Sequence, residues 1–129
     1  MYIRGNMLAR NFSECSENVK VELFRTYCCS LYGASLWCNY DIKHIKCIEV
    51  AYNNVFRSLL KIDRKSSISL CYMLAGIKHF KSLIRCCIFS LYKRVMTSEN
   101  SIIQCVVSSP YFFYQSHLLN MWKDKLFIL

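Results

Sequence analysis

Clustered carboxylates are the residues that phosphate chemistry would need first, because polymerases, nucleases and phosphatases usually hold divalent metal ions with them. The sequence has eight Asp and Glu residues, scattered along the chain, and no two Asp residues are adjacent. Its three glycines, Gly5, Gly33 and Gly76, are far apart and belong to neither glycine-rich phosphate-binding motif. We therefore expect no nucleotide or other cofactor, no small-molecule substrate and no metal-dependent phosphate transfer.

The nine cysteines are the second set of residues with chemical potential. The pairs Cys28–Cys29 and Cys86–Cys87 are adjacent in sequence, whereas structural zinc sites use cysteines two to four residues apart. The best metal-binding set combines Cys38, His44 and Cys47 and lacks a good fourth ligand. We expect small buried hydrophobic cysteines and no bound metal, and a zinc site is the alternative.

Nucleophilic catalysis would need a cysteine beside a histidine that a carboxylate orients. Cys47 and His44 offer only a three-residue spacing without such a carboxylate. His79 and His117 have no partner motif, so we expect surface or partly buried rings there. The sequence therefore predicts that the chain is not an enzyme.

Positive charge is concentrated in the middle of the chain. Overall there are 17 Lys and Arg residues against 8 Asp and Glu, a formal charge of +9. Between residues 50 and 98, however, Asp63 is the single acid among nine basic residues. The best-suited partner of such a segment is a polyanion, with nucleic acid ranked ahead of an anionic membrane surface. The alternative is that these basic residues only form a solvated helix face. The candidate nucleic-acid-binding residues are Arg57, Lys61, Arg64, Lys65, Lys78, Lys81 and Arg85.

A membrane location is disfavoured. Residues 101–122 carry no formal charge over 22 residues, about the length of a spanning helix. Pro110 and several polar side chains interrupt this stretch, and burying them in lipid would be costly. Residues 1–12 have no apolar core of signal-peptide length. We expect no membrane partner and an intracellular location, either cytoplasmic or nuclear.

The elements that position these residues are expected to be helices, since the chain is 54% hydrophobic and has only three Gly and one Pro. Apolar spacing predicts an all-α bundle of about four to six helices. Ser16 and Ser98 are predicted N-caps. On the second helix, Arg57, Lys61 and Arg64 follow at helical spacing and predict a solvent-facing basic ridge. The expected helices span residues 17–37, 42–61, 66–75, 80–95, 102–107 and 112–125.

Several segments, in order, carry a resemblance to a known family. They include residues 2–12 (YIRGNMLARNF), 19–24 (VKVELF), 50–57 (VAYNNVFR) and 98–103 (SENSII). This series resembles the region after the polymerase core in reverse transcriptases of non-LTR (LINE-like) retrotransposons. The resemblance covers residues 1–107 and leaves an aromatic tail, residues 108–129, unmatched.

The resemblance implies the C-terminal, thumb-and-after portion of an RNA-directed DNA polymerase. Its helices would follow the template-primer duplex or pack on the polymerase core, the partner in the parent protein. The family's aromatic-Ala-Asp-Asp signature does not occur here. We therefore expect a non-catalytic retroelement-derived fragment that contacts the backbone of RNA or an RNA–DNA duplex without reading sequence. The alternative is a packing module that docks through Tyr27, Leu31, Trp37, Tyr52 and Phe56.

Overall fold

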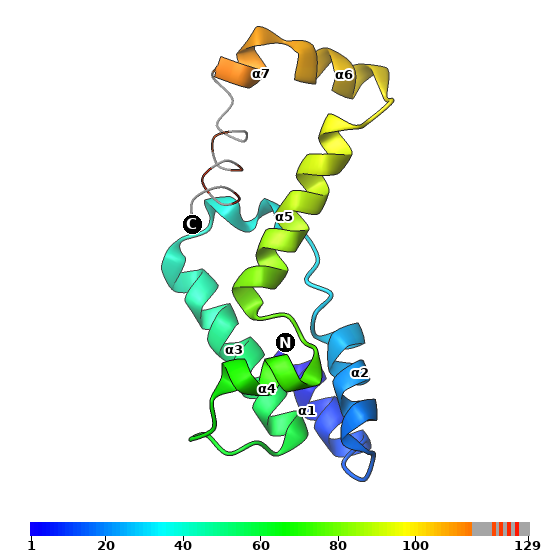
Figure 1. Ribbon diagram of the computed structural model, residues 1–129, viewed down its shortest axis with the longest axis vertical. Helices are drawn as coiled ribbons and strands as arrows, with labels where there is room; N and C mark the ends of the chain where they lie inside the picture. The colour runs from blue at the N-terminus through cyan, green and yellow to red at the C-terminus, as the bar shows by residue number, and fades with distance from the viewer. Residues whose placement is uncertain (115–119, 121, 123, 125, 127–129) are drawn as a thin grey trace. The chain divides into compact units, whose positions relative to one another are not determined.

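A computed structural model describes residues 1–114, 120, 122, 124 and 126. Within these residues all regular structure is helical and no strand occurs, so the prediction of an all-α fold is confirmed (Figure 1). The elements are α1 (Tyr2–Asn11), α2 (Glu17–Tyr27), a short 3-10 helix η1 (Ala34–Asn39), α3 (Ile42–Leu60), α4 (Ile68–Ala75), α5 (Phe80–Met96), α6 (Ser101–Ser108) and α7 (Pro110–Tyr114).

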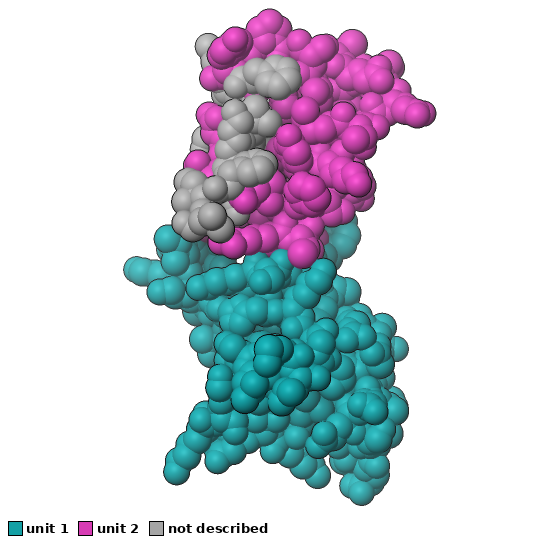
Figure 2. Space-filling view, in the orientation of Figure 1, with its two compact units in different colours: residues 1–32, 41–83 teal, residues 33–40, 84–129 magenta. Residues whose placement is uncertain are grey.

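The chain forms two compact units (Figure 2). Unit 1 comprises residues 1–32 and 41–83, and unit 2 comprises residues 33–40 and 84–129. The sequence placed a boundary between residues 107 and 108, whereas the packing groups residues on both sides of that position in unit 2.

Aromatic side chains from three helices form the core of unit 1. Tyr52 and Phe56 on α3 are fully buried, and the Phe24 ring of α2 meets each of them edge-on with ring centroids 5.0 Å apart. Tyr72 of α4 packs against Phe56 at 4.6 Å. Edge-to-face aromatic pairs stabilise a core beyond the area they bury. Helix α3 is therefore the central element of unit 1.

Helix α1 lies directly against α3 at Gly5. A Cβ atom added to Gly5 would lie 2.5 Å from Cγ1 of Val55, far inside van der Waals contact. Only glycine allows the two backbones to approach this closely. No helix was predicted before residue 17, so α1 is a finding of the structure.

The predicted helix over residues 17–37 is wrong in its C-terminal half. Helix α2 starts after Ser16 as expected but ends at Tyr27, and Gly33 has a left-handed backbone (φ 70°) that precedes η1. The inward face of α2 carries Lys20, Phe24 and Cys28. The buried Lys20 ammonium donates a hydrogen bond to the backbone oxygen of Ser13 at 2.8 Å. Val19 and Tyr27, in contrast, are exposed.

The next three helices agree with their predicted positions. Helix α3 ends at Leu60, α4 lies between Ser67 and a left-handed Gly76 (φ 62°), and α5 begins at Phe80. Helix α6 is capped by the Asn100 carboxamide, which accepts hydrogen bonds from two backbone amides, and not by Ser98 as predicted.

Unit 2 has a smaller core of its own. Ile88 of α5, Phe112 of α7 and Trp122 are buried together, and Tyr92 meets Trp122 edge-on at 5.6 Å. The aromatic tail that lacks the family resemblance thus supplies core side chains. The predicted helix over residues 112–125 lies mostly outside the described residues. Among the described helices, none has the length and apolar character to cross a membrane.

Candidate nucleic-acid interface

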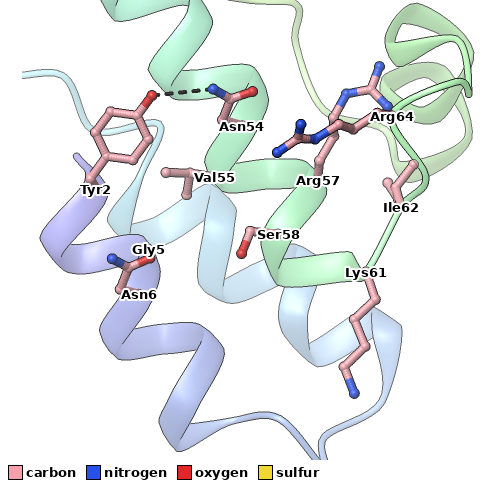
Figure 3. A pocket seen from close by; sticks show the side chains of 10 residues that line it. All are labelled: Tyr2, Gly5, Asn6, Asn54, Val55, Arg57, Ser58, Lys61, Ile62 and Arg64. Atoms are coloured by element: carbon pink, nitrogen blue, oxygen red, sulfur yellow. Dashed lines mark hydrogen bonds between the residues drawn. The ribbon is translucent and has the colours of Figure 1, made fainter.

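A half-open cleft of about 530 Å³ lies in unit 1 between α1, the C-terminal half of α3 and the loop that follows it (Figure 3). It is the place where candidate basic residues from different elements meet. The cleft is lined by Tyr2, Gly5, Asn6, Asn54, Val55, Arg57, Ser58, Lys61, Ile62 and Arg64.

Helix α1 provides one side of the cleft, with an aromatic ring and an amide. The Asn54 carboxamide donates a hydrogen bond to the Tyr2 hydroxyl at 3.3 Å, which links the start of α1 to α3. Asn6 lies one turn further along α1 (Figure 3). Gly5, which packs tightly against Val55, lies between Tyr2 and Asn6 in the sequence. This side of the cleft is polar and uncharged.

The other side carries the positive charge. Lys61 and Arg64 are both exposed, and Figure 3 shows them on the side away from Tyr2. Lys61 ends α3 in a left-handed conformation (φ 54°), which turns the chain into the loop that carries Arg64. Among the residues that the structure describes, none that lines the cleft is acidic. The nearby Asp63 carboxylate accepts a hydrogen bond from the backbone amide of Lys65 at 3.2 Å.

Arg57 braces this loop. Its guanidinium donates hydrogen bonds to the backbone oxygens of Asp63 at 2.5 Å and Ser66 at 2.7 Å. The three residues of the expected solvent-facing ridge, Arg57, Lys61 and Arg64, therefore have different roles. Arg57 is half-buried and positions the loop, whereas Lys61 and Arg64 are the exposed cations.

The remaining candidate cations lie outside the cleft lining. Lys65 is exposed on the loop, and Lys78 is exposed before α5, where its backbone oxygen accepts the Tyr52 hydroxyl at 2.9 Å. Lys81 and Arg85 are exposed on α5, and the division between the units falls between them. The structure thus brings together three of the predicted residues and leaves four elsewhere.

The polar partners of these cations were not predicted from the sequence. Asn54 and Ser58 share the helix face of Arg57 and Lys61, because positions three, four and seven residues apart lie on one side of a helix. That spacing was readable from the sequence. The roles of Tyr2 and Asn6 could not be read from the sequence, since nothing in its pattern places α1 against α3.

The predicted docking residues divide between core and surface. Tyr52 and Phe56 are fully buried in unit 1 and are therefore core residues, not an exposed docking face. Tyr27 is exposed, and Leu31 and Trp37 are half-buried. Tyr27 and Leu31 belong to unit 1, whereas Trp37 belongs to unit 2.

The expectation of buried cysteines holds for Cys28 but not for Cys47, Cys86 or Cys105, which are exposed. Burial raises the pKa of the Cys28 thiol, and it also raises that of Cys29, whose sulfur lies 3.3 Å from the Tyr52 hydroxyl.

A metal centre finds no support in the described part of the chain, where no three His, Cys, Asp or Glu residues are placed to hold a metal ion. His44 is exposed, and the His79 ring meets Tyr72 edge-on at 5.9 Å. The Cys38 side chain and His117 lie outside the described residues.

The cleft is suited to binding. Among the described residues, its lining offers cations, amides and hydroxyls. Such a set matches an anionic ligand with additional polar groups.

Comparisons with protein families, curated proteins and solved structures find no match to this chain.

Proposed function

We propose that the chain is a non-catalytic nucleic-acid-binding element that holds backbone phosphates at the cleft between α1 and α3. The observation that supports this most is that Lys61 and Arg64 both line one cleft whose described lining has no carboxylate. Arg57 adds a third positive charge and fixes the loop that carries Arg64. A concentration of cations on one surface raises the local concentration of a polyanion and steers it there.

The proposed ligand is the backbone of RNA or an RNA–DNA duplex, bound without regard to sequence. Phosphate contacts position a protein on nucleic acid but carry no sequence information. The resemblance of residues 1–107 to the region after the polymerase core of non-LTR reverse transcriptases supports this choice. A fragment of that origin would follow a template-primer duplex and leave catalysis to the polymerase core.

Fluorescence anisotropy with a labelled RNA–DNA duplex at low salt tests the proposal. Replacing Lys61 and Arg64 by Gln removes two phosphate contacts, each worth about 0.7 kcal/mol as for an exposed ion pair, so affinity should fall about tenfold. The matched control replaces Lys43 and Lys46 by Gln, because both are exposed on the first half of α3 and neither lines the cleft. This control changes the net charge equally and should cost less than threefold.

Equal losses for the two double variants would show that net charge alone attracts the duplex. Absence of salt-sensitive binding by the folded wild-type chain would refute the proposed function altogether.

A second candidate function is packing on a polymerase core, and the exposed apolar side chains of α4 favour it. Met73 is 71% exposed and Leu74 is 78% exposed. Neighbouring apolar side chains left in water are typical of interaction surfaces. Binding to a separately produced non-LTR polymerase core should weaken when Met73 and Leu74 are replaced by Ser. Unchanged binding of that folded variant would exclude α4 as the contact.

A further inference from the structure

The side of the cleft opposite its cations is chemically different from a simple phosphate site. Tyr2 is 50% exposed, and its hydroxyl is fixed by the Asn54 carboxamide at 3.3 Å. A half-exposed tyrosine whose ring is held at its tip offers a stacking surface. Aromatic rings beside a positively charged groove are the usual means by which proteins bind unpaired bases.

We propose that the cleft accepts an unpaired nucleotide of single-stranded RNA or DNA, whose base stacks on Tyr2 while phosphates of the same strand meet Lys61 and Arg64. This inference rests on the proposed function and specifies the state of the nucleic acid at the same site. In a duplex both faces of an internal base are covered by neighbouring base pairs. Only an unpaired or terminal base has a face available to Tyr2.

The dimensions and the remaining lining fit this ligand class. A volume of about 530 Å³ is in the range of pockets for small molecules and cofactors. Figure 3 shows Tyr2 and Asn6 on one side of the cleft and Arg64 and Lys61 on the other, so a ligand that spans it meets a ring and cations together. Asn6 and Ser58 add hydrogen-bonding groups for the sugar or the base edge.

Tight packing of α1 on α3 keeps the stacking surface in place. Gly5 permits the approach, and its contact with Val55 lies one helical turn from Tyr2. The Asn54–Tyr2 hydrogen bond adds a second tie between the two helices. Tyr2 is therefore positioned by the helix pair, and stacking would need little further ordering of the side chain.

The experiment compares a labelled single-stranded oligouridine with an RNA–DNA duplex of the same length, both at low salt. Tyr2→Leu should weaken binding of the single strand about five- to hundredfold, the usual loss when a stacking aromatic is removed. Tyr2→Phe keeps the ring and should remain within about threefold of wild type. Tyr32→Leu is the matched control, because Tyr32 is 99% exposed in the same unit and does not line the cleft.

An oligonucleotide that contains one 2-aminopurine base supplies a spectroscopic signature. Its fluorescence should be quenched on binding to the wild type and to Tyr2→Phe, but much less with Tyr2→Leu. Circular dichroism of each variant establishes that the helices are intact. If the Leu variant unfolds, 2-aminopurine quenching by the wild type decides the result, because binding of the strand without quenching would overturn stacking.

Equal effects of Tyr2→Leu and Tyr32→Leu, or an equal loss of single-strand and duplex affinity with Tyr2→Leu, would overturn the stacking inference. In both cases salt-sensitive duplex binding by the wild type would leave the proposed function standing. A Tyr2→Phe variant that binds the single strand as poorly as Tyr2→Leu would also overturn it.

Discussion

Single side chains around the cleft divide into those that hold the fold and those available to a ligand. Arg57 uses two guanidinium nitrogens to hold backbone oxygens of the loop after α3. Lys61 instead has an unfavourable left-handed backbone conformation at the end of α3. These opposite situations lead to separable effects on stability and on binding.

Replacing Arg57 by Met should destabilise unit 1. The Asp63 and Ser66 oxygens lose charge-assisted hydrogen bonds, and because these oxygens are exposed to water the loss should be about 1 kcal/mol. Arg64→Met is the control, since Arg64 is exposed and should change the unfolding free energy by less than about 0.5 kcal/mol. Urea unfolding followed by circular dichroism measures both. Equal stability of the two variants would mean that Arg57 does not brace the loop.

Replacing Lys61 by Gly should stabilise the chain while weakening its affinity for nucleic acid. Glycine adopts the left-handed conformation without the penalty that a Cβ atom imposes, and the net gain after the entropy of glycine in the unfolded chain is about 0.5 kcal/mol. Lys61→Gln removes the same charge and keeps the strain. Thermal unfolding and duplex titration of both variants separate the two effects. A Gly variant that loses stability, or that binds as tightly as wild type, would contradict this role of Lys61.

Buried tyrosine hydroxyls make stability sensitive to alkaline pH. Burial raises the pKa of Tyr52, with a further contribution from its hydrogen bond to Cys29, and burial likewise raises the pKa of Tyr72. The unfolded chain therefore releases these protons first, and stability that is complete below pH about 10 is lost as pH rises further.

Urea midpoints at pH 8 to 11.5, with a reductant present, measure this loss. Tyr72→Phe removes one of the two groups and should reduce the fall in unfolding free energy by about 1 kcal/mol per pH unit above pH 10. Tyr32→Phe, at a 99% exposed position, should leave the slope unchanged. Identical slopes in all three proteins would show that Tyr72 ionises as readily in the folded state as in the unfolded one.

At the scale of whole elements, the sequence predicted best where pattern and end signals agree. Helix α3 has a long apolar stripe, and Ser67 and Gly76 delimit α4 closely. The end of α2 was missed because the predicted helix over residues 17–37 runs through Gly33, which adopts a left-handed conformation outside a helix. Helix α1 buries only Gly5 and Leu8, so it has almost no apolar stripe to detect.

The candidate site shows the same limit. Arg57 and Lys61 follow helical spacing on α3 and could be predicted together. The side formed by Tyr2 and Asn6 depends on tertiary packing of α1 on α3, which includes the close contact of Gly5 with Val55. Local pattern carries no information about such a contact. The bracing role of Arg57 likewise depends on the path of a loop that sequence spacing does not specify.

The α1–α3 contact can be tested at Gly5. Alanine is the better helix former by about 1 kcal/mol, but its Cβ would clash with the stiff Val55 side chain, so Gly5→Ala should destabilise by roughly 1–3 kcal/mol net. Adding Val55→Ala should recover part of this loss, giving a favourable coupling in a double-mutant cycle. Chemical denaturation of the four proteins measures the coupling. Strict additivity would show that α1 does not pack on α3 at this position.

At the scale of the whole molecule, a chain of net charge +9 attracts polyanions wherever its cations lie. Binding at the cleft requires more specifically that Lys61 and Arg64 of unit 1 make the phosphate contacts. The distinguishing quantity is the number of counterions released on binding, because only phosphates that are contacted release them. Total charge and local contact therefore make different predictions.

The most direct test is the slope of log affinity against log salt for an RNA–DNA duplex. The double variant Lys61→Gln, Arg64→Gln should flatten the slope by about 1.8, at roughly 0.9 per phosphate contact by the B-DNA rule. The double variant Lys43→Gln, Lys46→Gln removes the same charge elsewhere on α3 and should leave the slope within about 0.5 of wild type. Equal flattening by the two variants, or none with the Lys61 and Arg64 variant, would contradict binding at the cleft.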